Sequence, residues 1–282
     1  MTVSRSSRFG YTTPVATTGG LVVDLTYADY LHIEELLTLQ KPRSEPAEHD
    51  ETLFIIVHQA YELWFKLLLH ELDKVKTDFV ANRTYPAIGT FKRLRTIMKV
   101  AVEQVDIVET LTPMSFNSFR DRLDKASGFQ SSQFREMEFL LGYKRAEMLE
   151  HQTPGTATYE QLVKRLNEPS VVDTFYVFLA HHGATIPEHL TTRDLTQPTA
   201  PDETVEEGIL WLYKNQHDLE ILFELMTDFD EGLQEWRYRH IKLVERTIGS
   251  KRGTGGSLGV EFLKRSLFHP VFPDLWAIRH RL

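Results

Sequence analysis

The sequence predicts an all-α protein built as a bundle of long helices. Apolar side chains recur at alternating spacings of four and three residues along most of the 282-residue chain, which is the period of a helix with one buried face. The strict alternation typical of strands is scarce, and we find no repeat or low-complexity block. The share of apolar residues, 41%, is ordinary for a globular protein, and a chain of this length can bury a large core.

Prolines, glycines and polar clusters mark where the expected helices begin and end. Residues 1–22 are rich in Ser, Thr and Gly and predict a flexible N-terminal arm, whereas residues 23–282 predict a single helical domain. The segment 186–201 contains three prolines and predicts a surface loop. Helices are expected at residues 27–40, 50–81, 86–110, 133–141, 159–166, 169–178 and 202–248, with a short one beginning at Val260.

The composition excludes several classes of site and partner. Without cysteine the chain has no disulfide, iron–sulfur cluster, zinc finger or thiolate-ligated haem, and any firmly held iron must rest on His, Tyr, Met or carboxylate ligands. A formal charge of −8 argues against nucleic acid as a partner. No secretion signal is visible and no run approaches the roughly 18 apolar residues of a membrane span. We therefore expect a cytoplasmic protein with no membrane partner.

His240 lies on a helix face where an apolar core residue is expected. A buried imidazole without a partner costs about 1–3 kcal/mol, so some group must bond to the ring or be ligated by it, and a metal is one candidate. The face consists of Leu222, Met226, Phe229, Leu233, Trp236, His240, Leu243 and Thr247.

His58 interrupts a second apolar face in the same way. For each histidine the alternative is a core residue bonded to a backbone carbonyl or a neighbouring tyrosine, and two such histidines on two long helices leave both interpretations open. The second face consists of Phe54, His58, Tyr61, Phe65, Leu68, Leu72, Val75 and Phe79.

The sequence does not match two other kinds of site. A di-iron carboxylate bundle uses Glu-x-x-His pairs, and the chain has none; the nearest spacing is Asp29-x-x-His32. The glycine-rich stretch 249–259 lacks the third glycine of a dinucleotide fingerprint, because Leu258 stands there, and it lacks the Gly-Lys-Ser/Thr of a P-loop. It is interpreted either as a helix end with Gly249 at a left-handed cap, or as a backbone cradle for a carboxylate or phosphate.

Arg120 follows two phenylalanines and precedes a Ser-Gly loop. The guanidinium is expected either to reach solvent beside Asp121 or Asp124, or to offer a bidentate fork to a substrate carboxylate. A charge-assisted contact of the second kind is worth about 1.5–3 kcal/mol. The residues alone leave both interpretations open.

Six segments, in this order, resemble the tryptophan 2,3-dioxygenase family of haem enzymes. They span most of the chain and are specific in combination. The segments are Asp29–Leu31, Leu53–Lys66, Phe116–Arg120, Ser127–Ser131, Trp236–His240 and Lys251–Ser257.

The resemblance implies a helical bundle that encloses a b-type haem, ferrous when it binds dioxygen. It also implies a homotetramer, assembled as a dimer of dimers, in which the N-terminal arm is exchanged between subunits. On that basis His240 is the axial ligand of the haem iron and His58 is the catalytic distal histidine near the indole N–H of L-tryptophan. Ser127 and Gly128 are assigned to cofactor binding.

The same resemblance assigns the substrate contacts. Arg120 pairs with the substrate carboxylate and Thr254 holds its amino-acid end. Phe54 and Phe116 border the indole. The remaining contacts come from the neighbouring subunit and are Tyr27 and Tyr30.

The reaction implied is the opening of the indole C2–C3 bond of L-tryptophan with O2 to give N-formyl-L-kynurenine, the entry step of tryptophan catabolism through kynurenine. Leu258 departs from the small residue expected after Gly-Gly-Ser. A haem monooxygenase that inserts one oxygen into a tryptophan-like substrate in natural-product biosynthesis is therefore the alternative. A haem sensor without turnover is a third hypothesis.

Overall fold

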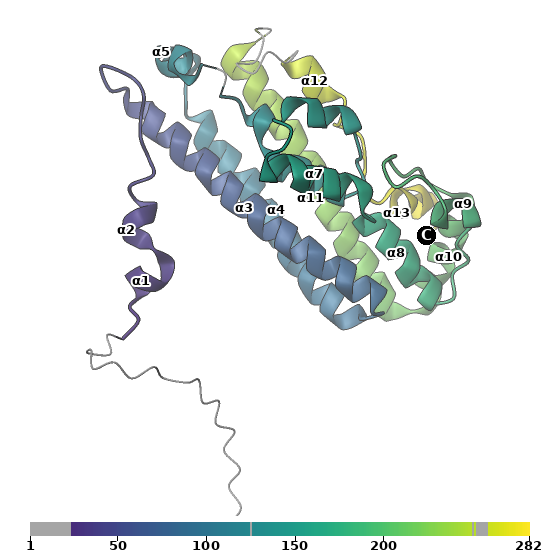
Figure 1. Cartoon of the computed structure of the whole chain (residues 1–282). Helices are drawn as coiled ribbons and strands as arrows, with labels where there is room; N and C mark the ends of the chain where they lie inside the picture. The colour runs from purple at the N-terminus through teal and green to yellow at the C-terminus, as the bar shows by residue number, and fades with distance from the viewer. Residues whose placement is uncertain (1–23, 125, 250, 252–258) are drawn as a thin grey trace, which may run out of the picture. The chain divides into compact units, whose positions relative to one another are not determined.

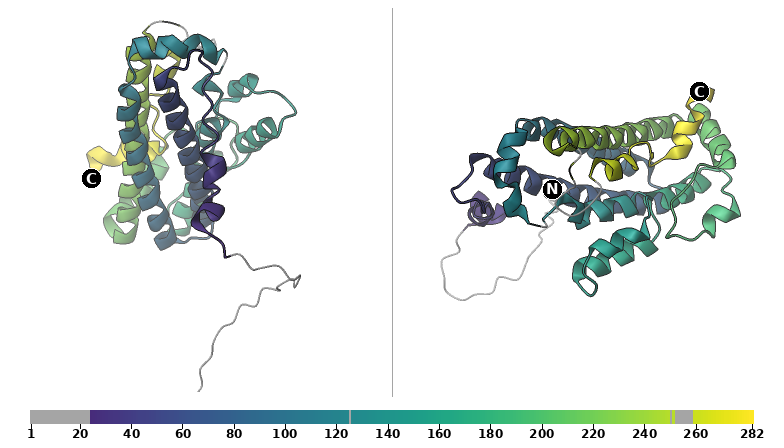
Figure 2. Two further views of the ribbon diagram at one scale, coloured as in Figure 1. Left: turned by 90° about the vertical axis from the view of Figure 1, so that its left-hand side faces the viewer. Right: turned by 90° about the horizontal axis from the view of Figure 1, so that it is seen from above.

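A computed structural model describes residues 24–124, 126–249, 251 and 259–282 of the chain (Figures 1 and 2). These residues form helices and connections, and no strand occurs among them, as predicted. One compact unit ends at Leu39 and the second spans Gln40–Leu282. The expected boundary between an arm at 1–22 and a domain at 23–282 falls on residues outside the described range and stays a prediction.

The first unit contains two short helices, α1 (Tyr27–Leu31) and α2 (Ile33–Leu36). The prediction of one helix over 27–40 is wrong, because His32 between them takes a left-handed conformation with φ 51° and ψ 43°. Thr26 caps α1, since its hydroxyl oxygen accepts the N–H of Asp29. Neither helix has a buried residue, so residues 24–39, the described part of this unit, have no core of their own.

Helices of very different length make up the second unit. The α-helices are α3 (His49–Val80), α4 (Thr84–Glu109), α5 (Pro113–Arg120), α6 (Ser132–Leu140), α7 (Ala157–Asn167), α8 (Val171–His181), α9 (Glu188–Thr191), α10 (Glu203–Asn215), α11 (His217–Ile248), α12 (Val260–Lys264) and α13 (Pro273–Ala277). The 3₁₀ helices are η1 (Asp121–Leu123), η2 (Gly128–Gln130), η3 (Ala146–His151) and η4 (Ile278–Arg281).

α3 and α4 form an antiparallel pair joined by residues 81–83 (Figure 1). The Tyr61 hydroxyl of α3 donates to the Ala101 carbonyl of α4 over 2.9 Å. In return, the Gln104 side chain of α4 donates to the Val57 carbonyl of α3 over 3.0 Å. As the residue number rises on one helix it falls on the other, so the N-terminal part of α3 lies beside the C-terminal part of α4.

α4 and α11 run side by side in the same direction (Figures 1 and 2). Three polar pairs join them, and the partners in each pair are 133 residues apart in the chain. A constant separation over more than 20 residues means that the two helices are parallel and hold one register. The pairs are Tyr85–Asp218, Arg95–Asp228 and Asp106–Arg239.

The core lies between these helices and the shorter ones that cover them. Fully buried phenylalanines of α3, α4, α8 and α11 contact one another, with Phe79 and Phe178 centred 5.0 Å apart. By length and mean hydropathy α3 is the one described helix that could cross a membrane. Its apolar residues Leu68, Leu72 and Val75 are nevertheless fully buried in this core, as in the central helix of a globular domain.

The prediction of one helix over 202–248 is wrong. Gln216 takes an extended conformation, with φ −131° and ψ 95°, and separates α10 from α11. The break lets α10 fold back so that Val205, Ile209 and Leu212 are buried in the core. No proline or glycine marks Gln216, so the break follows from packing. The expected loop at 186–201 also contains one helical turn, α9.

Asp230 on α11 fastens the C-terminal segment to the bundle. Its carboxylate is fully buried and accepts the backbone N–H groups of Val271 (2.8 Å) and Phe272 (3.0 Å) and the indole N–H of Trp276 (3.0 Å). Gln234 donates to the other oxygen over 3.2 Å. Burial raises the pKa of Asp230, and these four donors oppose the rise by stabilising the charge.

Replacing this carboxylate should unfasten the C-terminal segment. Asp230→Ala leaves two buried backbone N–H groups without acceptors, and we expect the free energy of unfolding to fall by about 3 kcal/mol. Asp228→Ala is the matched control, because Asp228 is 41% exposed and forms a surface ion pair with Arg95, which is worth at most about 1 kcal/mol. Urea denaturation of both variants measures the difference, and equal losses would contradict the role of Asp230.

Candidate functional site

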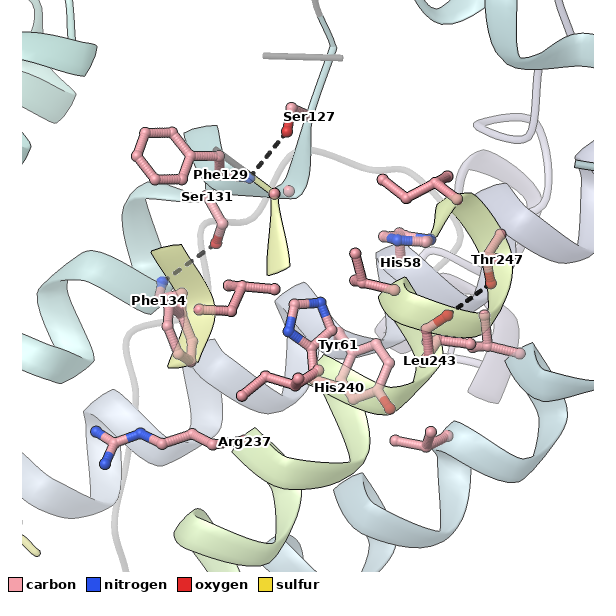
Figure 3. A pocket seen from close by; sticks show the side chains of 18 of the residues that line it. His58, Tyr61, Ser127, Phe129, Ser131, Phe134, Arg237, His240, Leu243 and Thr247 are labelled. Carbon is pink, nitrogen blue, oxygen red and sulfur yellow. Dashed lines mark hydrogen bonds between the residues drawn. The ribbon is translucent and has the colours of Figure 1, made fainter. Parts of the chain in front are cut away.

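A mostly apolar pocket of about 280 Å³ lies at one end of the second unit. It is bordered by α3, α4, α5, α6, α11 and α12. Figure 3 shows that His58 and His240 enter it from two different long helices. The two predicted apolar faces, each interrupted by one histidine, therefore meet at one cavity.

His240 lies on α11 and has no hydrogen-bond partner among the described residues. The indole of Trp236, one turn earlier, stacks on its imidazole with the ring centres 5.1 Å apart and the planes 9° from parallel. Its remaining accessible surface borders the pocket, so burial still lowers the pKa of His240 to about 4, aided by His58 and Arg135. The ring is therefore neutral at physiological pH and keeps a nitrogen lone pair.

His58 lies on α3, one turn after Phe54. Its Nδ1 is 2.7 Å from the Phe54 carbonyl, and because a carbonyl only accepts, Nδ1 carries the proton. His58 is exposed, but toward the pocket that it lines, and burial by the surrounding protein lowers its pKa. In the neutral ring Nε2 is then an acceptor. The sequence left two interpretations open for each histidine: a hydrogen bond to the protein, or ligation of another group. The hydrogen bond to a backbone carbonyl is present at His58, and among the described residues it is absent at His240.

The residues around His240 fit one kind of metal group. No cluster of three or more His, Cys, Asp or Glu side chains that could hold a bare ion occurs in the described part of the chain. A single neutral imidazole in an apolar pocket suits a metal that brings its other ligands with it, as the iron of a haem does. The His240 ring, which has no hydrogen-bond partner among the described residues, supports this fit, since its free nitrogen would hold such an iron.

Phenylalanines form one wall of the pocket, and their contact with a substrate stays a prediction. Phe54 and Phe116 line the pocket with ring centres 5.7 Å apart, and Phe119 packs behind them at 5.6 and 5.5 Å. Arg120 ends α5 and lines the same pocket. Asp124 shortly after it has φ 48°, which is uncommon for a residue other than glycine.

The remaining predicted residues divide into three groups. Ser127 and Gly128 line the pocket, and the Ser127 hydroxyl accepts the Phe129 N–H over 3.3 Å (Figure 3). Tyr27 and Tyr30 are exposed on α1 in the first unit, and their role stays a prediction. Thr254 lies outside the described residues.

The helix end predicted at Gly249 differs in one detail. Gly249 has the expected positive φ of 60°, but its ψ of −132° is not that of a left-handed helical cap.

Sequence reasoning missed five charged residues that line the pocket: Glu62, Arg135, Glu138, Arg145 and Arg237. Arg135 and Glu138 are an i, i+3 pair on α6 with 5% and 3% of their surface exposed. Arg237 is three residues before His240 on α11. Arg135, Arg145 and Arg237 each have another charged residue within two positions in the sequence, so each alone resembles a surface charge.

Comparisons with known proteins agree with this geometry. A family model described as tryptophan 2,3-dioxygenase matches residues 16–181 and 208–282. The chain is 51% identical over 255 residues to the tryptophan 2,3-dioxygenase of Herpetosiphon aurantiacus, covering 90% of this chain and 97% of that one. It is 46% identical over 258 residues to the enzyme of that name from Anaeromyxobacter sp. strain K, covering 92% and 96%. The chain therefore belongs to the tryptophan 2,3-dioxygenase family.

Proposed function

We propose that this chain opens the indole C2–C3 bond of L-tryptophan with O2 to give N-formyl-L-kynurenine. Family membership supports the reaction. The observation that carries it at the level of residues is the pair of neutral histidines that enter one apolar pocket from α3 and α11.

His240 would hold the haem by ligating its iron. A neutral imidazole on a long packed helix is a rigid ligand, and the Trp236 indole stacked on it restricts rotation of the ring. We assign the group to the b type from the family resemblance, and the chain has no cysteine for the covalent attachment of a c-type haem. When bound in the ferrous state, the haem would supply the iron that binds and activates dioxygen.

His58 and Arg120 position the substrate. His58 Nε2 accepts the indole N–H, since Nδ1 is already committed to the Phe54 carbonyl. Arg120 pairs with the carboxylate, and Phe54 and Phe116 hold the indole plane. Thr254 lies outside the described residues, and its role in holding the amino-acid end of the substrate rests on the family resemblance. Ser127 and Gly128 contact the cofactor at the pocket's edge.

The working assembly is a cytoplasmic homotetramer in which Tyr27 and Tyr30 complete the site of a neighbouring subunit. The exposed side chains of the first unit support this assembly. Leu25, Tyr27, Tyr30 and Leu37 each have at least 70% of their surface exposed, and apolar surface of this kind is normally covered by a partner.

His240→Ala should abolish haem binding, because the pocket then offers no axial ligand. The absorption spectrum of the purified chain reports haem content, and added imidazole should restore part of it by filling the vacated position. His217→Ala is the control on the same helix, because His217 is 89% exposed. Full haem retention in His240→Ala would reject the assignment.

Arg120→Met should raise the KM for L-tryptophan about tenfold to a hundredfold, since a charge-assisted bond is worth about 1.5–3 kcal/mol. Haem content should not change. Binding of tryptamine, which lacks the carboxylate, should be the same in both proteins. Arg122→Met, at an exposed position two residues on, is the control. An equal loss for both ligands would exclude a contact between Arg120 and the carboxylate.

Turnover of L-tryptophan by the reduced protein under labelled dioxygen tests the reaction itself. Mass analysis should find two labelled atoms in N-formyl-L-kynurenine. One labelled atom in an oxindole-type product would instead identify the monooxygenase alternative. Haem binding without any product from tryptophan or its substituted analogues would identify a sensor.

A further inference from the structure

Three arginines from separate segments gather around one glutamate at the edge of the pocket. Arg135 on α6 donates to the Glu138 carboxylate, and Arg145 donates to the same oxygen over 2.8 Å. Arg237 on α11 donates through Nη1 to the carbonyls of Ser266 (3.1 Å) and His269 (2.8 Å). We call Arg135, Arg145 and Arg237 the arginine cluster.

The arginine cluster has more donors than the described residues satisfy. Each guanidinium bonds through one terminal nitrogen, and the second terminal nitrogen donates to no described residue. The three Nε atoms are buried without an acceptor. Arg135 and Arg237 are each only 5% exposed, so water outside the protein does not solvate them well. An arginine this deeply buried normally has its N–H groups paired, because an unpaired buried charge is costly.

The charge around the arginine cluster is not balanced by the protein. Glu138 faces all three guanidinium groups, and Asp230 acts on Arg237 from one side. Two carboxylates therefore meet three guanidinium groups, and Asp230 already accepts four other donors. Over the whole described pocket lining, the acidic residues are Glu62 and Glu138 and the basic ones are Arg120, Arg135, Arg145 and Arg237. This pocket therefore favours a ligand that carries negative charge.

The arginine cluster lies beside His240. Arg237 precedes His240 by three residues on α11, which is about 4.5 Å along the helix axis. Arg135 is close enough to the His240 ring to disfavour its protonation. Arg120, by contrast, ends α5. It directly follows Phe119, which packs with Phe54 and Phe116 in the phenylalanine wall.

We infer that the arginine cluster is the subsite for the carboxylate side arms of the tetrapyrrole that His240 ligates. The inference rests on the proposed function, because it presumes that haem is the group in the pocket. The flat apolar ring of a tetrapyrrole suits the aromatic lining of the pocket. The carboxylates at its periphery would accept charge-assisted hydrogen bonds from the guanidinium nitrogens that have no acceptor among the described residues. A ligand that reaches both the imidazole and the cations must combine a metal with acidic arms. Tryptophan has no metal and a single carboxylate.

Haem loss from the full-length holoprotein to excess apomyoglobin tests the inference without any enzyme assay. The protein is loaded either with haem or with haem dimethyl ester, whose arms carry no charge. We expect the wild-type chain to lose the ester at least about tenfold faster than haem, since one charge-assisted bond is worth that factor.

The variant Arg145→Met tests whether the arginine cluster causes the difference in loss rate between haem and its ester. Glu138 keeps Arg135 as its partner in this variant, so no buried carboxylate is stranded. We expect Arg145→Met to lose haem about tenfold faster than the wild type and the ester at the wild-type rate. Arg135→Met, in which Glu138 keeps Arg145, should show the same pattern. Lys242→Met is the control, because Lys242 lies close to His240 on α11 but is 50% exposed and pairs with Glu245.

Three results would overturn the inference. If Arg145→Met and Arg135→Met speed the loss of haem and ester by the same factor, the arginines only support the fold. If they raise the KM for tryptophan and leave haem loss unchanged, the arginine cluster binds the amino acid instead. If the wild-type chain holds the ester as firmly as haem, no cation pairs with the arms. A chain that binds neither haem nor ester would reject the proposed function itself.

Discussion

The fixed register between α4 and α11 is the constraint on which the site depends. The two helices are parallel and joined by polar pairs at a constant separation of 133 residues, while α3 is antiparallel to α4. The N-terminal part of α3 and the C-terminal part of α11 therefore meet at the same end of the bundle. His58 and His240 come together only there. A slip of one turn would move His240 by about 5.4 Å along the axis.

Burial acts on the polar groups of this bundle in two different ways. Asp230 is fully buried, but four donors satisfy it, so its role is structural. The His240 ring is surrounded by protein and has no partner among the described residues, and burial keeps it neutral and able to ligate. The arginine cluster likewise keeps unused donors. Asp230, whose bonding is complete, therefore holds the fold, whereas His240 and the arginine cluster, whose bonding is incomplete among the described residues, line the pocket.

Local signals predicted the long helices and the inward histidines well. The period of apolar residues placed the ends of α3 within one residue and those of α4 within two. The breaks at His32 and Gln216 were missed, because neither position carries a proline or glycine and the α10 fold-back depends on distant core residues. The arginine cluster was missed for a related reason: Arg135, Arg145 and Arg237 come from separate segments, and each alone resembles a surface charge.

The sequence by itself determined that the protein is helical, that it lacks thiolate chemistry, and that one histidine on each of two long faces points inward, because side-chain period and composition are local properties. Its family resemblance also indicated the haem and the substrate. Only the tertiary structure decided that both histidines border one pocket, that His58 is bonded while His240 is not, and that the arginines beside it exceed their acceptors. These are properties of side chains far apart in the chain, and packing alone brings them within reach of one another.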